Sequence, residues 1–165
     1  MEAKKDLTFE RVLNASRETV WKAWTDPKLV AQWWGPNGVT NPICEIDARV
    51  GGVVHIVMEA GEALGAAKGM RWPMKGIFTE VVELERLVFT SSAFSSADEK
   101  EAAIETTTEV TLIEDGGKTK MTVHTFVTRT NPAASGGFPS AEQMISGMEA
   151  GWSQQFDKLE KFLGR

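Results

Sequence analysis

Hydrophobic and polar residues alternate at the start of the chain and then change to a helical spacing. In LTFERVLN (residues 7–14), Leu7, Phe9 and Arg11 fall on one face of an extended chain, and this alternation predicts a strand. Apolar residues then recur every three or four positions as far as Trp34. That spacing predicts helix rather than strand.

Capping residues divide the helical stretch into two short helices. Ser16 is a favourable N-cap, and Glu18 suits the positive end of the helix dipole. Asp26-Pro27 ends the first helix and begins the second, because aspartate caps well and proline fits the first helical position. Gly35-Pro36 is expected to end the second helix. The tryptophans are expected on the inward side of both helices, with Trp21 and Trp24 in the core.

Six further strands are expected between residue 43 and residue 129, in segments rich in β-branched and aromatic residues. Short connections join them, including the hairpin signal EDGGK (residues 114–118) and a polar loop at 95–101, so an antiparallel meander is favoured over βαβ units. The Gly/Ala-rich segment 61–71 is expected to be a mobile loop. The expected strands are residues 43–49, 53–60, 73–83, 86–94, 103–115 and 118–129.

A long helix is expected at the C-terminus, over residues 141–163, where it would be about 35 Å long. Ser140 and Gln143 have the spacing of a capping box. Gly147 and Gly151 each cost this helix about 1 kcal/mol relative to alanine, a cost that is tolerated where a backbone must approach something closely. The apolar stripe of the helix consists of Ile145, Met148, Trp152, Phe156, Leu159 and Leu163.

Composition and charge argue against several classes of protein, including nucleic-acid-binding proteins and membrane-spanning proteins. The chain has 165 residues, 42% of them hydrophobic and 25% charged, which predicts one globular domain over residues 1–165. A net charge of −5 without a basic patch argues against nucleic acid as a partner, and no apolar run is long enough for insertion into a membrane. The N-terminus lacks the apolar core of a signal peptide, and the single cysteine excludes an internal disulfide, so a cytoplasmic protein is expected.

Four stretches of the chain are distinctive, namely ASRETVWKAWTDPKLVAQWWGP, VGGVVHIVM, WPMKGIFTEVVELERLVFT and GMEAGWSQQFDKLEKFL. Together with the order of elements, these stretches resemble the START-like, Bet v 1-like superfamily. More narrowly, the chain resembles the domain related to the activator of Hsp90 ATPase. The resemblance implies an α+β helix-grip fold, in which a seven-stranded curved antiparallel sheet, two short helices after the first strand and a long C-terminal helix enclose a cavity.

The chain also departs from the pattern of that family. The loop after Met58 usually carries an acidic-glycine turn and an aromatic residue, whereas this chain has EAGEALGAAKG, and it has no tyrosine. We therefore expect the mouth of the cavity to differ from that of relatives, and no tyrosine hydroxyl can act as an acid.

Few residues suggest catalysis. His55 alternates with residues expected to point inward, so it is expected on the outer face of the sheet. The sequence does not decide which face of its strand His124 occupies. Two isolated histidines without carboxylates or cysteines at ligand spacing predict no metal site, and no glycine-rich phosphate loop is present, so no cofactor is expected. Cys44, on an alternating strand, is expected to be a buried inert thiol.

The favoured interpretation is a module that binds a small hydrophobic molecule in the cavity. An enzyme of the cyclase, hydrolase or lyase type stays open, with His124 as its one good titratable group, and so does a protein that interacts with the chaperone Hsp90. The sequence leaves open whether the chain forms a homodimer. For each cavity-lining candidate plain packing is the alternative; the candidates are Trp33, Trp34, Met58, Met74, His124, Met148, Trp152 and Phe156.

Overall fold

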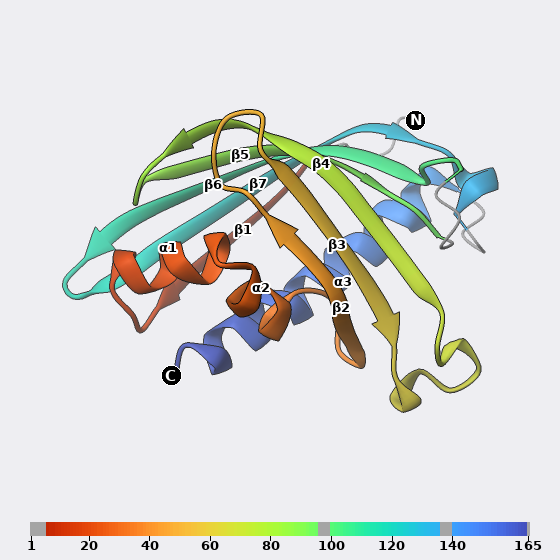
Figure 1. Cartoon of the computed structure of the whole chain (residues 1–165), viewed down its shortest axis with the longest axis horizontal. Coiled ribbons are helices and arrows are strands. Elements are labelled where there is room, and N and C mark those ends of the chain that lie inside the picture. The colour runs from red at the N-terminus through yellow and green to blue at the C-terminus, as the bar shows by residue number, and fades with distance from the viewer. Residues whose placement is uncertain (1–5, 96–99, 136–139, 165) are drawn as a thin grey trace.

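A curved sheet of seven antiparallel strands wraps around one long helix (Figure 1). The structure is a computed structural model that describes residues 6–95, 100–135 and 140–164. The strands follow the order β1-β7-β6-β5-β4-β3-β2 across the sheet, and each neighbouring pair is antiparallel. They are β1 (Asp6–Leu13), β2 (Val39–Ile46), β3 (Val53–Ala60), β4 (Arg71–Val82), β5 (Arg86–Ala93), β6 (Ile104–Asp115) and β7 (Lys118–Thr130).

The helices begin where the capping residues predict. In each case a side-chain oxygen accepts a backbone N–H of the first turn: Ser16 Oγ from Thr19, Asp26 Oδ1 from Lys28 and Ser140 Oγ from Gln143. The helices are α1 (Arg17–Thr25), α2 (Pro27–Trp33) and α3 (Ala141–Phe162), with short 3₁₀ segments η1 (Glu62–Ala67) and η2 (Pro132–Ala134).

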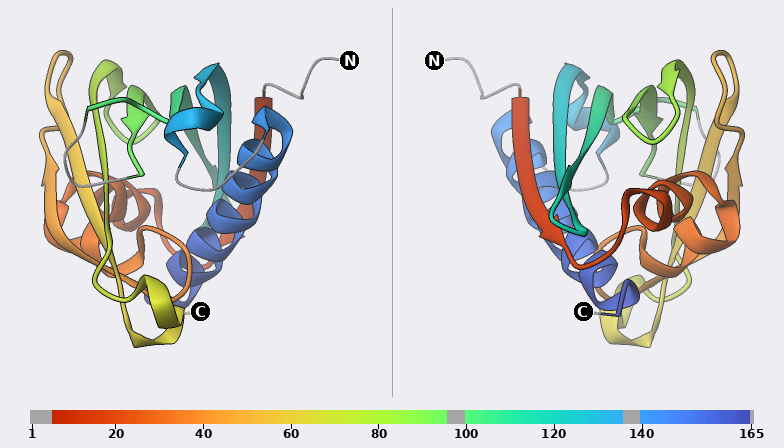
Figure 2. Two further views of the ribbon diagram at one scale, coloured as in Figure 1. Left: turned by 90° about the vertical axis from the view of Figure 1, so that its right-hand side faces the viewer. Right: turned by 90° about the vertical axis from the view of Figure 1, so that its left-hand side faces the viewer.

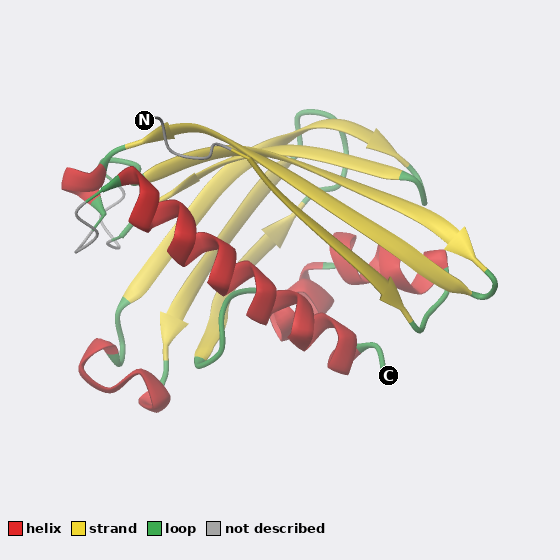
Figure 3. Cartoon of the chain, turned by 180° about the vertical axis from the view of Figure 1, so that it is seen from behind, coloured by secondary structure: helices red, strands yellow, loops and turns green. Residues whose placement is uncertain are grey.

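The long helix α3 crosses the concave face of the sheet, as Figure 3 shows from behind. It packs closest against β1, β7 and α2. Arg11 of β1 holds the C-terminal half of α3, because its Nη1 lies 2.7 Å from Asp157 Oδ1 and 3.3 Å from Glu160 Oε1. In the end-on views of Figure 2, the strands β2, β3 and β4 stand apart from α3 on the other side of the fold.

The predicted tryptophan core is confirmed for Trp24, whose ring centroid lies 4.9 Å from that of Trp33. Both indole N–H groups have partners: Trp24 Nε1 donates to Met121 Sδ at 3.3 Å and Trp33 Nε1 donates to the Ala23 carbonyl at 3.0 Å. Trp21 is half-buried and packs against the core from its edge. These rings pack α1 and α2 against the core. Figure 1 shows both helices under one end of the curved sheet.

The hairpin predicted at residues 114–118 is confirmed. Gly116 and Gly117 have φ angles of 56° and 87°, the left-handed values that a tight two-residue turn between antiparallel strands requires. Two other sequence predictions need correction, because β2 begins at Val39 rather than at residue 43 and the expected loop 61–71 contains η1.

Backbone hydrogen bonds explain why the segment around η1 is structured. Gly61 N donates to the Gly38 carbonyl, and Ala60 exchanges bonds with Met70 and Gly69 across the base of the segment. Of the polar loop expected at 95–101, residues 96–99 lie outside the described residues.

Candidate functional site

Two adjoining cavities occupy the space between the sheet and the N-terminal half of α3. The mouth chamber has a volume of about 430 Å³, and the inner chamber has a volume of about 270 Å³. Five residues belong to the walls of both, namely Trp72, Ala93, Phe94, Ile104 and Met148. The two chambers therefore adjoin along a shared wall, and together they are called the hollow.

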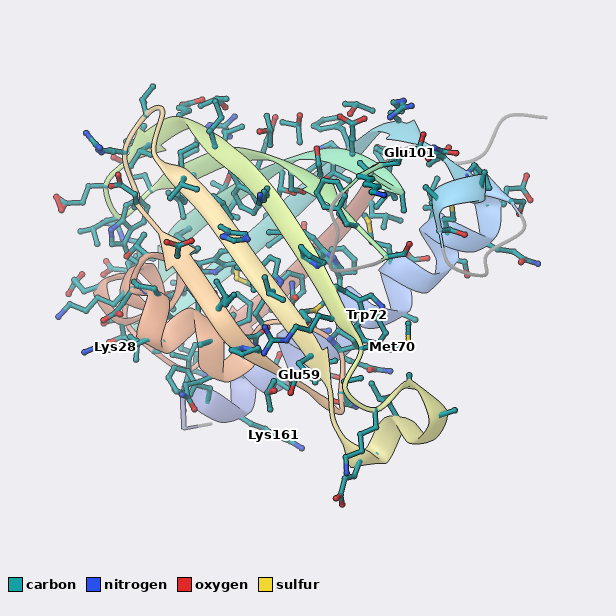
Figure 4. All side chains as sticks on the ribbon, turned by 45° about the vertical axis from the view of Figure 1, so that its right-hand side comes forward. Lys28, Glu59, Met70, Trp72, Glu101 and Lys161 are labelled. Atoms are coloured by element: carbon teal, nitrogen blue, oxygen red, sulfur yellow. The ribbon has the colours of Figure 1, made fainter. Side chains whose placement is uncertain are left out.

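Each chamber has its own set of further lining residues. The mouth chamber is also lined by Ala67, Met70, Ser95, Ala103, Ser135 and Met144. Figure 4 shows Met70 and Trp72 together where β4 leaves η1. The inner chamber is also lined by Trp34, Gly35, Pro36, Met58, Pro73, Met74, Ser91, Thr106, Gly147, Gly151, Trp152 and Gln155.

The glycines of α3 help to create the inner chamber. Gly147 and Gly151 are one helical turn apart and both lie in its wall, where larger residues would project into the hollow. A Cβ atom added to Gly151 would lie 3.7 Å from Pro36 Cβ, which is ordinary contact, so nothing in the packing demands glycine there. The two glycines lower the stability of the helix, and the absence of side chains at these positions leaves space between α3 and the sheet.

Methionine is the most frequent residue type in the wall, and three tryptophans also line it. Five of the seven methionines of the chain line the two chambers: Met58, Met70, Met74, Met144 and Met148. Methionine is unbranched and polarisable, so such a wall can adapt to apolar molecules of different shapes. None of the described lining residues is an aspartate, glutamate, lysine, arginine or histidine.

Five of the eight residues predicted to line a cavity lie in the wall of the inner chamber: Trp34, Met58, Met74, Met148 and Trp152. Contact between these residues and a ligand stays a prediction.

Trp33 and Phe156 were predicted in the wall but lie behind it, in the packed core. Both side chains are fully buried, and their ring centroids are 6.3 Å apart. Both rings pack against Trp24 at the end of the hollow where α2 meets α3. Aromatic side chains fill the space around Trp33 and Phe156, so neither ring faces a chamber.

His124 lies on the outer face of the sheet, away from both chambers. Its neighbours Val123 and Thr125 are fully buried, so alternation turns the imidazole outward, where Nε2 lies 3.2 Å from Asp6 Oδ2. The prediction that His55 lies on the outer face is confirmed, because its Nδ1 lies 2.8 Å from the exposed Glu45 carboxylate. Neither histidine lines the hollow.

The sequence prediction missed several wall residues. Met144 precedes Met148 by one helical turn, and this spacing could have identified it. Trp72 and Phe94 lie at strand ends, where the alternation of polar and apolar residues does not predict which face of the sheet a side chain occupies. Ser91, Thr106 and Gln155 are polar and buried, at 7%, 5% and 1% exposure, and a search for apolar positions passes over them.

The buried polar groups of the inner chamber are partly paired. Ser91 Oγ and Thr106 Oγ1 are 2.7 Å apart on the neighbouring strands β5 and β6. On the opposite wall, Gln155 Oε1 accepts the Gly35 N–H at 2.8 Å. The positive φ of Gly35, +87°, turns the chain so that this N–H faces α3.

Cys44 of β2, which is half-buried against the core rather than fully buried, and Lys158 of α3 have pKa values displaced by their surroundings. Burial, with a smaller contribution from Glu45, raises the pKa of the Cys44 thiol to about 11, so the thiol is neutral and unreactive near pH 7. Burial lowers the pKa of Lys158, whose Nζ donates to the carbonyls of Trp34 and Pro36. Lys158 thus holds the turn after α2 from behind the chamber wall.

The described part of the chain comprises residues 6–95, 100–135 and 140–164. Within these ranges no three potential metal ligands of the histidine, cysteine, aspartate or glutamate type come together. Within the same ranges no helix combines the length and the apolar character needed to cross a membrane.

The sequence profile of one protein family, described as Activator of Hsp90 ATPase homolog 1-like protein, matches residues 14–164. No curated protein matches the chain.

Solved structures of several bacterial proteins are similar over nearly the whole chain. A protein from Nitrosomonas europaea has 26% sequence identity and a TM-score of 0.73, with 99% of this chain and 96% of that chain covered. A protein from Chromobacterium violaceum has 24% identity and a TM-score of 0.76, with 98% of each chain covered. A protein from Rhodobacter sphaeroides has 20% identity and a TM-score of 0.74, with 99% of this chain and 95% of that chain covered. The second and third similarities concern the fold alone.

Proposed function

We propose that this chain, which belongs to the Activator of Hsp90 ATPase homolog 1-like family, binds a small hydrophobic molecule in the hollow between its sheet and α3. The observation that carries the proposal is the hollow itself, with its methionine and tryptophan wall. Ligand pockets commonly have volumes of about 300–1,000 Å³ and mostly apolar walls with a few polar groups. The two adjoining chambers match that description.

Burial of apolar surface is sufficient to drive such binding. Each CH₂ group taken from water contributes about 0.8 kcal/mol, so a molecule that buries eight to ten of them gains about 6–8 kcal/mol before the cost of association. Because a micromolar dissociation constant corresponds to about 8 kcal/mol, burial of this many CH₂ groups supports affinity no tighter than micromolar, and larger or hydrogen-bonded ligands bind more tightly.

The lining residues favour binding over acid–base catalysis. A cyclase, hydrolase or lyase of the usual kind needs a titratable group within reach of its substrate. The described wall offers none, His124 lies on the outer face, and the Cys44 thiol is neutral at physiological pH. Interaction with Hsp90 is suggested by the family description alone, and a pull-down with the chaperone would test it.

The experiment is a titration with N-phenyl-1-naphthylamine, an uncharged dye that fluoresces when it leaves water. We expect the wild type to bind the dye with micromolar affinity. Met148→Trp should remain folded and lose most of that binding, because Met148 lies in the wall shared by both chambers and a larger side chain fills them.

Two control variants separate filling of the hollow from other effects. Glu149→Trp adds the same side chain at the next, exposed position of α3 and should leave dye binding unchanged. His124→Ala should also leave it unchanged, because the imidazole lies on the outer face. A wild type that does not bind the dye, or a Met148→Trp variant that binds it as well as Glu149→Trp does, would refute the proposal.

A further inference from the structure

The inner chamber contains hydrogen-bond donors that have no acceptor among the described residues. The core tryptophans Trp24 and Trp33 both donate their indole N–H to a protein atom. Trp34 lines the inner chamber and is 4% exposed, and its indole N–H has no such acceptor in the described part of the chain. The indole N–H of Trp34 can therefore donate either to water or to a molecule in the chamber.

Gln155 adds a second unused donor on α3. The bond from Gly35 N to Oε1, at 2.8 Å, fixes which end of the amide is the acceptor. The Nε2 atom is buried and has no partner among the described residues. An unpaired buried amide is costly, so a residue kept in this state in a chamber wall is a candidate for ligand contact.

The hydroxyl pair on the sheet side provides a third donor. Ser91 and Thr106 carry two hydroxyl hydrogens, and their mutual bond of 2.7 Å uses one of them. No other side-chain bond of either hydroxyl is present in the described structure, so one hydrogen is left for the chamber. Both residues lie in its wall.

The charges around the chamber are as informative as its donors. The described walls of both chambers contain no cation that could hold a carboxylate or phosphate and no anion that could hold an amine. Lys158 lies behind the wall, with its Nζ on the carbonyls of Trp34 and Pro36. An ion placed in this hollow would lose its hydration without gaining a partner of opposite charge.

We propose that the ligand is an uncharged molecule with a hydrogen-bond acceptor, such as a ketone, ester or ether oxygen, which accepts from the Ser91–Thr106 pair and from Gln155 in the inner chamber. Its hydrocarbon part extends toward the methionines of the mouth chamber. This inference rests on the proposed function and specifies the ligand class of the same hollow. A pure hydrocarbon would leave these donors unpaired, whereas an acceptor oxygen can accept hydrogen bonds from them.

The test uses three naphthalenes of similar size in competition with N-phenyl-1-naphthylamine: 2-acetylnaphthalene, 2-ethylnaphthalene and 2-naphthoate. Water also forms hydrogen bonds to the ketone, so the absolute order of affinities does not isolate the bond in the protein. The informative quantity is the ratio of the ketone affinity to the ethyl affinity, compared between variants. We also expect the charged 2-naphthoate to bind at least about tenfold more weakly than the ketone at pH 7.

Ser91→Ala/Thr106→Val removes the hydroxyl pair with little change of shape and should lower the ratio about five- to tenfold, the value of one net hydrogen bond. The matched control is Thr108→Val/Thr125→Val, which removes a similar buried pair, 2.9 Å apart, that does not line the chamber. This control should leave the ratio unchanged. Gln155→Met tests the donor on the opposite wall. A change in the site that weakens the ketone and the ethyl compound equally leaves the ratio of their affinities unchanged.

The outcomes distinguish this inference from the proposed function. A ratio that falls in the Ser91/Thr106 or Gln155 variant and not in the control supports the inference. If the ratio is the same in all variants, or if 2-naphthoate is the tightest ligand, the ligand class is wrong while binding in the hollow stands. If none of the three compounds displaces the dye and the dye itself does not bind, both proposals fail.

Discussion

The indole rings of Trp34 and Trp152 meet edge to face, with their centroids 5.6 Å apart and their planes at 68°. Trp34 follows α2 and Trp152 lies in the middle of α3, so this contact joins the two helices at the wall of the inner chamber. Trp152 also stacks on Phe9 of β1 at 6.1 Å. One side chain thus links α3, α2 and the edge of the sheet.

We expect Trp152→Ala to lower the free energy of unfolding by about 3 kcal/mol, the low end of the range for a large aromatic residue removed from a core. The low end applies because Trp152 is only half-buried, with one side toward the chamber. Urea denaturation measures the change. A loss below about 1 kcal/mol would mean that the ring contacts contribute little to the packing of α3.

Gly35 is required at the turn after α2 for two reasons. Its φ of +87° is unfavourable for other residues, and an added Cβ would lie 2.7 Å from both Met58 Sδ and Val39 Cγ2. We therefore expect Gly35→Ala to destabilise the fold by about 3–4 kcal/mol, from backbone strain and overpacking together.

Gly51→Ala is the matched control for that variant. Gly51 has a similar φ of +83° with no atom within 4 Å of the added Cβ, so only the strain of about 1–2 kcal/mol applies. Equal losses in the two variants would show that the contacts of Gly35 with Met58 and Val39 do not matter.

Local signals were sufficient to predict most of the fold. The caps at Ser16, Asp26 and Ser140 fixed the starts of the three helices, because each provides the oxygen that the first turn needs. The structure at η1 was missed because its stability comes from Gly61, which bonds to the distant Gly38. A contact of that kind leaves no periodic signal.

The depth of each residue within the hollow was harder to predict. The apolar stripe of α3 is continuous, yet Met148 faces space and Phe156 is fully buried among other rings. Periodicity identifies the inward face of a helix, but the point where the sheet diverges from it is set by tertiary packing. On β7, buried Thr125 and exposed Phe126 reverse the usual assignment of polar and apolar faces, and the face of His124 therefore could not be read.

The neutral thiol of Cys44 predicts slow alkylation in the folded protein. The raised pKa of about 11, against 9.0 for the unperturbed group, lowers the thiolate fraction at pH 8 about 100-fold. Iodoacetamide should therefore label the native chain at least that much more slowly than the chain unfolded in urea. Equal rates at pH 8 would show that the thiol is neither buried nor displaced in pKa.

The same pKa shift has a consequence for stability at alkaline pH. The folded state holds the Cys44 thiol proton more tightly than the unfolded state does. The contribution of the protonated thiol to the free energy of unfolding is therefore fully present below pH 9 and is lost as the pH rises toward 11. The difference in unfolding free energy between wild type and Cys44→Ala should therefore shrink over that range. This difference excludes the contribution of Lys158, which both proteins share.

The most direct test of binding in the hollow follows the methionine methyl groups by NMR during titration with N-phenyl-1-naphthylamine. Met58, Met70, Met74, Met144 and Met148 line the chambers, whereas Met121 is fully buried in the core and serves as an internal reference. With the protein labelled with ¹³C at the methionine methyl groups, we expect the signals of the wall methionines to shift and that of Met121 to stay in place. Unchanged wall signals at saturating dye, or shifts at Met121 alone, would contradict the claim that this hollow is the binding site.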